Sequence, residues 1–218
     1  MSPNDHENER LSLDEIARTL SPFVGHGVSK LQLISIAKYL ELLKKWNQTI
    51  SLTSITEDAE IVARHFGESM FVSSLHLMER GRLADVGSGA GFPGIPLKIA
   101  HPDLHVTLIE PNTKKCAFLR EVQAALRLSG MQVIRSRYED FDAPHNSFDF
   151  ICSRALGASK GLLRWSKWVL RADGHVILWL GIEDSTLLAS RAKGWNWERP
   201  VKIPESRRRA VLSGRPLG

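Results

Sequence analysis

Residues 83–96 read Leu83-Ala84-Asp85-Val86-Gly87-Ser88-Gly89-Ala90-Gly91-Phe92-Pro93-Gly94-Ile95-Pro96. This order predicts a buried strand, then a glycine-rich turn, then the start of a helix. Glycine reaches positive φ and has no Cβ to keep a ligand away from the backbone. Open α/β sheets bind nucleotide-like cofactors at such loops, at the carboxyl ends of their strands. The stretch therefore predicts an α/β fold with a cofactor-binding loop at Gly87, Gly89 and Gly91.

Two carboxylates accompany this loop. Glu110 closes a second apolar strand, Val106-Thr107-Leu108-Ile109, about twenty residues further on, where an acidic side chain can accept both hydroxyls of a ribose. Asp85 precedes the first glycine, so we expect its carboxylate near a ligand ammonium.

Two cofactors fit this arrangement. Residues 89–94 match G-x-G-x-x-G, which admits a dinucleotide, but such a site needs an open helix N-terminus for the pyrophosphate. Bulky Phe92 and Pro93 occupy that turn, and no second nucleotide-binding half follows. S-adenosylmethionine therefore fits better than a dinucleotide. A glycine turn that only connects strand to helix is the third interpretation, although a turn does not require the acidic residue that follows.

Strand and helix patterns alternate from residue 82 onward. The alternation predicts a mostly parallel sheet covered on both faces, ending in an antiparallel pair near 197–203 and 208–213. Helical patterns precede it, so we expect an N-terminal helical cap over residues 1–80 and an α/β core over 81–218. The expected strands are 82–86, 105–109, 131–135, 148–152 and 174–179; the expected helices are 13–20, 30–46, 58–77, 95–100, 113–128, 158–170 and 184–192.

Composition restricts the class of protein. The chain has 218 residues, 43% of them hydrophobic, and no apolar run near the roughly 20 residues that span a membrane. Residues 1–10 are polar and lack a signal core, so we expect a frayed terminus and a cytoplasmic protein. Cys116 and Cys152 lack metal-ligand spacing, which predicts two buried thiols and no metal site. No coiled-coil heptad appears, so we expect a monomer.

Positive charge is concentrated in the last third of the chain. Residues 1–150 carry 16 Lys and Arg against 19 Asp and Glu, whereas residues 151–218 carry 13 against 5. This asymmetry favours a phosphate-rich partner on one side of the molecule, with a solvated basic face as the alternative.

Several motifs occur together in one order, and with them the chain resembles the ribosomal small-subunit methyltransferase G family, also called glucose-inhibited division protein B. The resemblance extends from about residue 33 to about residue 212 and includes the Phe92-Pro93-Gly94-Ile95-Pro96 continuation of the glycine loop. The other motifs are Trp46-Asn47, Leu52-Thr53, Arg64-His65, Lys114-Lys115-Cys116-Ala117-Phe118-Leu119-Arg120 and Ser153-Arg154-Ala155.

The resemblance implies a fold, an activity and a partner. The fold is the class I S-adenosylmethionine-dependent methyltransferase, Rossmann-like, with a mostly parallel seven-stranded sheet, an antiparallel last strand and a small N-terminal helical cap. The activity is methylation of N7 of one guanine in 16S ribosomal RNA of the small ribosomal subunit. The alternatives are a methyltransferase of this fold acting on another RNA or a small molecule, and a dinucleotide-binding module.

The residues and the resemblance together give a set of expected cofactor contacts. By resemblance, Tyr138 and Glu139 flank the adenine and Arg154 lies at the active-site end of the fourth strand. The full set is Asp85, Gly87, Gly89, Gly91, Phe92, Glu110, Tyr138, Glu139 and Arg154.

This chain departs from the family pattern at three places. The usual Asn-Leu-Thr reads Ser51-Leu52-Thr53, the usual Asp-Ser-Leu reads Glu68-Ser69-Met70, and Leu180 replaces a lysine after the fifth strand. The motifs expected to bind the cofactor match the family pattern, so we expect these three departures to affect how the RNA is held.

Arg154 is the expected catalytic-site residue, in a substrate-positioning role. Guanine N7 has an exposed lone pair, so methyl transfer needs alignment of the reactants and no general base. A guanidinium can donate to guanine O6 or to a phosphate. The alternative for Arg154 is a salt bridge with Glu139 or Asp149.

Eight further residues are expected to contact RNA, each with a structural alternative. Trp46 and Asn47 suit stacking and hydrogen bonding to a base, or the packing of a helix end. His65 suits the site entrance, or an ordinary helix position. Lys114 and Lys115 suit phosphate contacts, or a solvated face. The run Arg207-Arg208-Arg209, expected on a strand, suits phosphates, or a charged edge that prevents aggregation.

Overall fold

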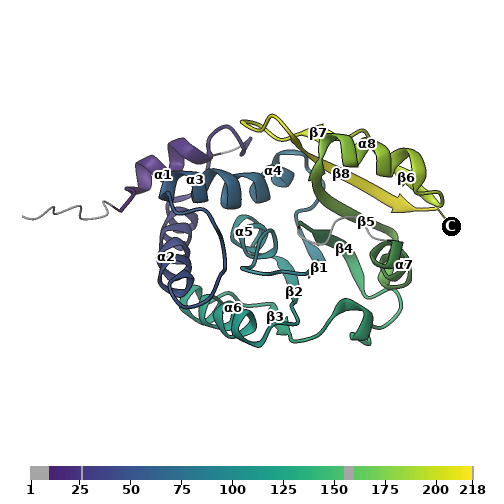
Figure 1. Cartoon of the computed structure of the whole chain (residues 1–218), viewed down its shortest axis with the longest axis horizontal. Coiled ribbons are helices and arrows are strands. Elements are labelled where there is room, and N and C mark those ends of the chain that lie inside the picture. The colour runs from purple at the N-terminus through teal and green to yellow at the C-terminus, as the bar shows by residue number, and fades with distance from the viewer. Residues whose placement is uncertain (1–9, 26, 155–159, 218) are drawn as a thin grey trace, which may run out of the picture.

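The computed structural model describes residues 10–25, 27–154 and 160–217 (Figure 1). Its centre is one sheet with the strand order β3-β2-β1-β4-β5-β8-β6, and β7 pairs with β8 beside this path. The strands are β1 (Gly81–Val86), β2 (Leu104–Ile109), β3 (Met131–Ile134), β4 (Phe148–Ser153), β5 (Leu170–Gly181), β6 (Trp195–Trp197), β7 (Val201–Lys202) and β8 (Arg209–Pro216).

The strand directions confirm the predicted sheet. Strands β1 to β5 pair in parallel, and β8 pairs antiparallel to β5. The strand count differs from the expected seven, because eight strands lie in the described part of the chain. The segment expected as one strand over 197–203 forms two short strands, β6 and β7, which both pair with β8. Pro200, which has no backbone N–H to donate, lies between them.

Helices cover both faces of the sheet (Figure 1). Helices α2 (Lys30–Asn47), α5 (Gly94–Ala100) and α6 (Thr113–Leu126) share a hydrophobic cluster with one face. Helices α7 (Lys160–Val169) and α8 (Ile182–Arg191) share the cluster on the other face. Between β3 and β4 the chain forms only a short 3₁₀ helix, η2 (Tyr138–Asp140).

The N-terminal helices begin where the sequence predicts. Ser12 and Ser29 each form a capping box at the start of α1 (Leu13–Leu20) and α2. The helix expected over 58–77 is corrected: it consists of α3 (Asp58–Ile61), a π-helical segment η1 (Val62–Gly67) and α4 (Glu68–Ser74). Hydrophobic spacing does not reveal such a local change of pitch.

The N-terminal helices and the sheet share one hydrophobic cluster. It runs from Ile16 in α1 through Tyr39 and Phe66 to Leu83 and Ile177 in the sheet. The division at residue 80 stays a prediction about chain organisation. No helix in the described ranges is long and apolar enough to cross a bilayer. Residues 1–9 of the expected polar terminus and residues 158–159 of an expected helix lie outside those ranges.

Candidate active site at the carboxyl ends of β1, β2 and β4

The glycine loop after β1 has the predicted backbone conformation. Gly87, Gly89 and Gly91 have φ values of 72°, 56° and 87°. A Cβ on Gly89 would meet nothing nearer than the Gly87 carbonyl oxygen at 3.9 Å, so the space beside Gly89 is open. A Cβ on Gly91 would lie 2.6 Å from both Tyr39 Oη and Ile95 Cδ1. A side chain at position 89 would therefore enter open space, whereas the lack of a side chain at Gly91 is required for internal packing. The expected cofactor contacts of both glycines stay predictions.

Glu110 lies beside this open space. Its Oε2 accepts a hydrogen bond from Gly89 N at 2.9 Å, and its Oε1 accepts from Asn112 N at 2.8 Å. Each carboxylate oxygen keeps a second lone pair for another donor. An open backbone cradle next to an acceptor carboxylate fits the methionine and ribose parts of S-adenosylmethionine, which Gly87, Gly89 and Glu110 would hold.

Asp85 is hydrogen-bonded to the end of the glycine loop, where helix α5 begins. Its side chain is fully buried, and its Oδ2 accepts from Gly94 N at 3.0 Å. A Cβ on Gly94 would lie 2.7 Å from that oxygen, so the helix start can approach the carboxylate only as glycine. Burial raises the pKa of Asp85 from 3.8 to about 7. Asp85 therefore fixes the turn into α5, and its expected place near a ligand ammonium stays a prediction.

Phe92 is also a packing residue. Only 8% of it is exposed, and its ring stacks against Tyr39 and His65 with centroid distances of 5.3 and 4.7 Å. The Tyr39 hydroxyl donates to the Ala90 carbonyl oxygen in the same loop. This aromatic stack connects the loop to α2 and η1, and the expected cofactor contact at Phe92 stays a prediction.

His65 is a partly buried, neutral imidazole that contacts Thr53. Its Nε2 lies 2.7 Å from Thr53 Oγ1, which already accepts from Ile55 N at 3.1 Å. Burial, followed by the charges of Arg154, Arg64 and Arg209, lowers the pKa of His65 to about 3. Within the described residues, buried Nδ1 has no hydrogen-bond partner.

Arg154 pairs with Glu68 and not with Glu139 or Asp149, which corrects the expected alternative. Its Nη2 lies 3.2 Å from Glu68 Oε2. Asp149 instead pairs with Arg82 and Arg171. The Nη1 group of Arg154 is buried and has no hydrogen-bond partner in the described part of the chain. Burial lowers the pKa of Arg154 to about 10, so the guanidinium remains charged at neutral pH.

A second arginine completes this cluster. Arg209 Nη2 lies 2.5 Å from Glu68 Oε1, and Glu68 itself is only 3% exposed. Burial raises the pKa of Glu68, and the charges of Arg154 and Arg209 oppose that shift. Sequence reasoning did not assign a role to Glu68; its only signal was the departure from the family pattern at that position.

The three-arginine run lies partly on β8. Arg207 and Arg208 are exposed and precede the strand, and only Arg209 belongs to it, which corrects the expected placement on a strand. Arg64, Arg207, Arg208 and Arg209 line an open groove of about 400 Å³ next to Glu68. We call this feature the arginine groove.

Trp46 and Asn47 make the packing contacts of the structural alternative, and their expected RNA contacts stay a prediction. The Trp46 ring packs on Phe118 at a centroid distance of 5.8 Å, and its Nε1 donates to Glu121 at 2.9 Å. Asn47 accepts from Leu52 N and Thr53 N and donates to the Thr53 carbonyl oxygen. Both side chains stabilise the 47–53 loop.

The remaining expected contacts lie at the edge of the site. Lys114 and Lys115 begin α6, whose N-cap is Asn112, and Lys114 is exposed. In η2, Tyr138 packs on Trp165 at 5.7 Å and Glu139 is exposed.

Two other positions at which this chain departs from the family pattern, Ser51 and Leu180, lie outside the cluster around Glu68. Ser51 is exposed in the 47–53 loop, and Leu180 lies within β5, opposite Ala210 of β8.

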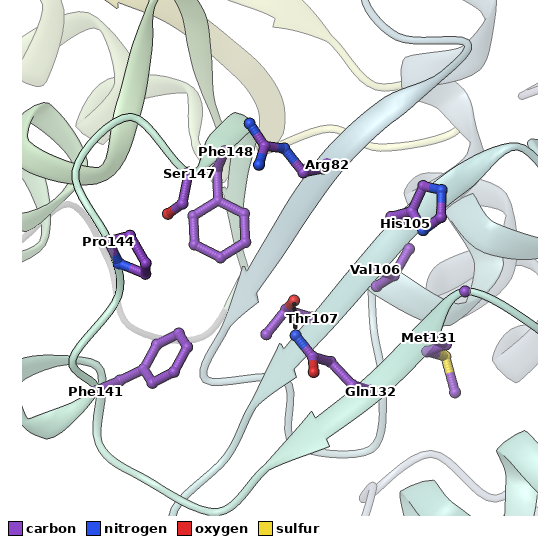
Figure 2. A pocket seen from close by; sticks show the side chains of 11 residues that line it. Arg82, His105, Val106, Thr107, Met131, Gln132, Phe141, Pro144, Ser147 and Phe148 are labelled. Carbon is purple, nitrogen blue, oxygen red and sulfur yellow. Dashed lines mark hydrogen bonds between the residues drawn. The ribbon is translucent and has the colours of Figure 1, made fainter.

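Another groove, of about 470 Å³, lies apart from the glycine loop (Figure 2). Phe141, Pro144 and Phe148 stand opposite strands β1 to β3, where Gln132 donates to Thr107 at 2.9 Å (Figure 2). None of its lining residues belongs to the loop, so we do not include it in the candidate site.

Comparison with known proteins gives one consistent family. The sequence profile of the rRNA small subunit methyltransferase G family matches residues 32–208. Ribosomal RNA small subunit methyltransferase G of Pseudomonas fluorescens (strain Pf0-1) is 39% identical over 174 residues, which cover 80% of this chain and 78% of the relative. The protein of the same name from Roseiflexus castenholzii (strain DSM 13941 / HLO8) is 38% identical over 168 residues, or 76% and 71% of the two chains.

Solved structures share the fold at low identity. An S-adenosylmethionine-dependent methyltransferase from Aquifex aeolicus superposes with a TM-score of 0.59 at 16% identity, over 84% of this chain and 98% of the other. A ribosomal protein L11 methylase from Lactobacillus delbrueckii subsp. bulgaricus gives 0.54 at 18% identity, over 72% and 80%. The class I methyltransferase fold is thereby confirmed.

Proposed function

This chain belongs to the rRNA small subunit methyltransferase G family, and from that premise we propose that it transfers a methyl group from S-adenosylmethionine to N7 of a guanine in 16S ribosomal RNA. The proposed substrate is the small ribosomal subunit or its RNA. We further propose that the protein acts as a monomer in the cytoplasm, where small subunits are assembled.

The register of three neighbouring strands is the observation that carries this proposal. Asp85 of β1 is paired with Leu108 of β2 and with Cys152 of β4. Two residues further along each chain come Gly87, Glu110 and Arg154, so these three lie side by side at the carboxyl edge of the sheet. Parallel sheets bind ligands at this edge. This order supports the proposal, because Gly87 lies between Glu110, the proposed ribose acceptor, and Arg154, the proposed donor to the guanine.

The chemistry requires positioning more than proton transfer. S-adenosylmethionine, when bound, supplies an electrophilic methyl group. Guanine N7 attacks with its own lone pair, so the protein has to bring nucleophile and methyl into line and exclude competing orientations. Arg154 is suited to that task, because its buried Nη1 group keeps donors free for guanine O6 or a phosphate. At neutral pH an arginine cannot act as the base.

The arginine groove is the proposed contact surface for the RNA backbone. Arg64, Arg207 and Arg208 lie along it, and Arg209 connects it to Glu68 and thereby to Arg154. Arginine is suited to phosphate because its planar fork makes two parallel hydrogen bonds. The groove is thus lined by Glu68, the residue that pairs with Arg154.

Mass mapping of nucleosides tests the proposal. Purified protein and isotope-labelled S-adenosylmethionine are incubated with small subunits from cells that lack this modification, with free 16S RNA and with transfer RNA. We expect labelled 7-methylguanosine at one position of 16S RNA. Label in transfer RNA only, or at another atom of guanine, would contradict the proposed substrate or the proposed site of methylation.

A further inference from the structure

Glu68 is the one acidic group to which both Arg154 and Arg209 are recorded as bound in the described residues. We propose that Glu68 is a positioning residue for methyl transfer, which holds Arg154 so that its Nη1 group stays turned toward the substrate. This inference rests on the proposed function, because it names the residue that fixes the substrate-binding arginine.

The contacts of Glu68 leave it little freedom to move. One carboxylate oxygen accepts from Arg154 at 3.2 Å and the other from Arg209 at 2.5 Å. Its backbone carbonyl accepts from Trp179 Nε1 at 2.7 Å. Because both carboxylate oxygens are engaged on different arginines, rotation of the side chain would break both ion pairs.

The unused donors argue for a ligand and against a purely structural cluster. Glu68 supplies one negative charge to two guanidinium groups, so the cluster keeps a net charge of +1. Buried Nη1 of Arg154 has no partner among the described residues, and an unsatisfied buried donor on a charged group is costly. Buried ion pairs also add little stability compared with apolar residues of similar size. An acceptor oxygen of the substrate, either guanine O6 or a phosphate, would complete the hydrogen bonds.

The location of Glu68 connects three parts of the site. It begins α4 directly after η1, the segment that holds His65 against Phe92 of the glycine loop. Arg154 follows β4, and Arg209 begins β8. Glu68 therefore joins the cofactor loop, the substrate arginine and the arginine groove in one rigid cluster.

A double-mutant cycle tests this role. Single-turnover methyl transfer on small subunits is measured for Glu68→Gln, Arg154→Gln and the double variant. We expect Glu68→Gln to slow transfer by about 10-fold to 100-fold, the range for a lost hydrogen bond to a charged group, with unchanged affinity for S-adenosylhomocysteine. If Glu68 acts through Arg154, the double variant is as slow as Arg154→Gln alone within about twofold. Additive losses would overturn the proposal.

Two further variants separate positioning from folding. Glu68→Asp keeps the charge and both acceptor oxygens, so we expect most of the rate to return; a rate as low as that of Glu68→Gln contradicts the role of the carboxylate. Glu41→Gln is the matched control, because Glu41 is about half exposed and, among the residues that the structure describes, forms its ion pair with exposed Arg10. We expect Glu41→Gln to keep the rate of the unmodified chain.

A spectroscopic readout distinguishes failure of this inference from failure of the proposed function. In protein with ¹⁵N-labelled arginine, the Arg154 side-chain signal is assigned by its loss in Arg154→Gln. We expect slow rotation of this guanidinium in the unmodified chain and fast rotation in Glu68→Asn, without any RNA present. Fast rotation in both proteins overturns the positioning role. Slow rotation in a protein that methylates no guanine contradicts only the proposed reaction.

Discussion

His65 stacks on Phe92 with ring centroids 4.7 Å apart and planes inclined by 20°. This contact joins the π-helical segment η1 to the glycine loop. Tyr39 of α2 also stacks on Phe92. The N-terminal helices thus fix the shape of the loop that would hold the cofactor. Segment η1 is followed directly by Glu68, which pairs with Arg154. The same stretch of chain therefore contacts both the glycine loop and Arg154.

Asp85 is buried and His65 is partly buried at a different place, and the shifts of their pKa values predict opposite effects of pH on the stability of the protein. The raised pKa of Asp85 makes the folded state bind more protons than the unfolded state between about pH 4 and 7. The contribution of Asp85 to the free energy of unfolding is therefore lost as the pH rises through this range. The lowered pKa of His65 makes the unfolded state bind more protons between about pH 3 and 6.5, so stability rises with pH there.

Substitutions separate the two effects. We expect Asp85→Asn to make the free energy of unfolding rise more steeply from pH 4 to 6.5 than in the unmodified chain. We expect His65→Asn to make it fall over the same window. Urea unfolding at a series of pH values measures both slopes, and parallel curves for the three proteins would show that neither group titrates as described.

Gly89 and Gly91 predict different outcomes for similar substitutions. Gly89→Val projects a branched side chain into open space. The positive φ of 56° strains a valine and lowers stability, but no atom obstructs the side chain, so we expect a protein that still folds and does not bind S-adenosylhomocysteine. Gly91→Ala places its Cβ against Tyr39 and Ile95, so we expect a loss of roughly 1–3 kcal/mol in stability. Thermal unfolding and calorimetry check both, and full ligand affinity in folded Gly89→Val would remove the loop from the site.

Glu110 predicts a defined loss of cofactor affinity. Glu110→Ala removes the carboxylate that would accept the ribose hydroxyls, so we expect binding of S-adenosylhomocysteine to weaken by about 1–3 kcal/mol. Because Glu110 also accepts from Gly89 N, the unfolding midpoint is measured alongside. Adenosine-free S-methylmethionine serves as a second ligand in the same calorimeter; an equal proportional loss for it would indicate a distorted loop in place of a lost ribose contact.

Two exposed arginines predict the salt dependence of RNA binding. Each neutralised phosphate releases counterions, so Arg207→Gln/Arg208→Gln should reduce the slope of log affinity against log salt by about 1–2. Arg209 is left in place because it pairs with Glu68. The charge-matched control is Arg18→Gln/Lys30→Gln, since neither residue lines the arginine groove. Equal slopes for both double variants would mean that Arg207 and Arg208 contact no phosphate.

Local patterns made much of the fold predictable. Glycine conformations at 87–91 and the alternation of strands and helices are properties of short segments, so the sequence alone indicated the parallel sheet and its loop. Capping residues Ser12 and Ser29 likewise act within three residues of their partners.

Long-range partners were not predictable in the same way. Trp46 donates to Glu121 of the neighbouring helix α6, and Arg154 pairs with Glu68 of α4. Both partners are far away in the sequence, and no local pattern indicates them. Glu68 stayed without a role because its two arginines come from distant strands.

The central claim is that Arg154 orients the guanine and that no group accepts a proton. Single-turnover methyl transfer on small subunits, measured from pH 6 to 9 for the unmodified chain and for Arg154→Lys, tests it most directly. Lysine keeps the charge but loses the planar fork, so we expect transfer to slow by about 10-fold or more, with flat pH profiles for both proteins. Full activity in Arg154→Lys, or a rate that rises with pH to a plateau, would contradict the claim.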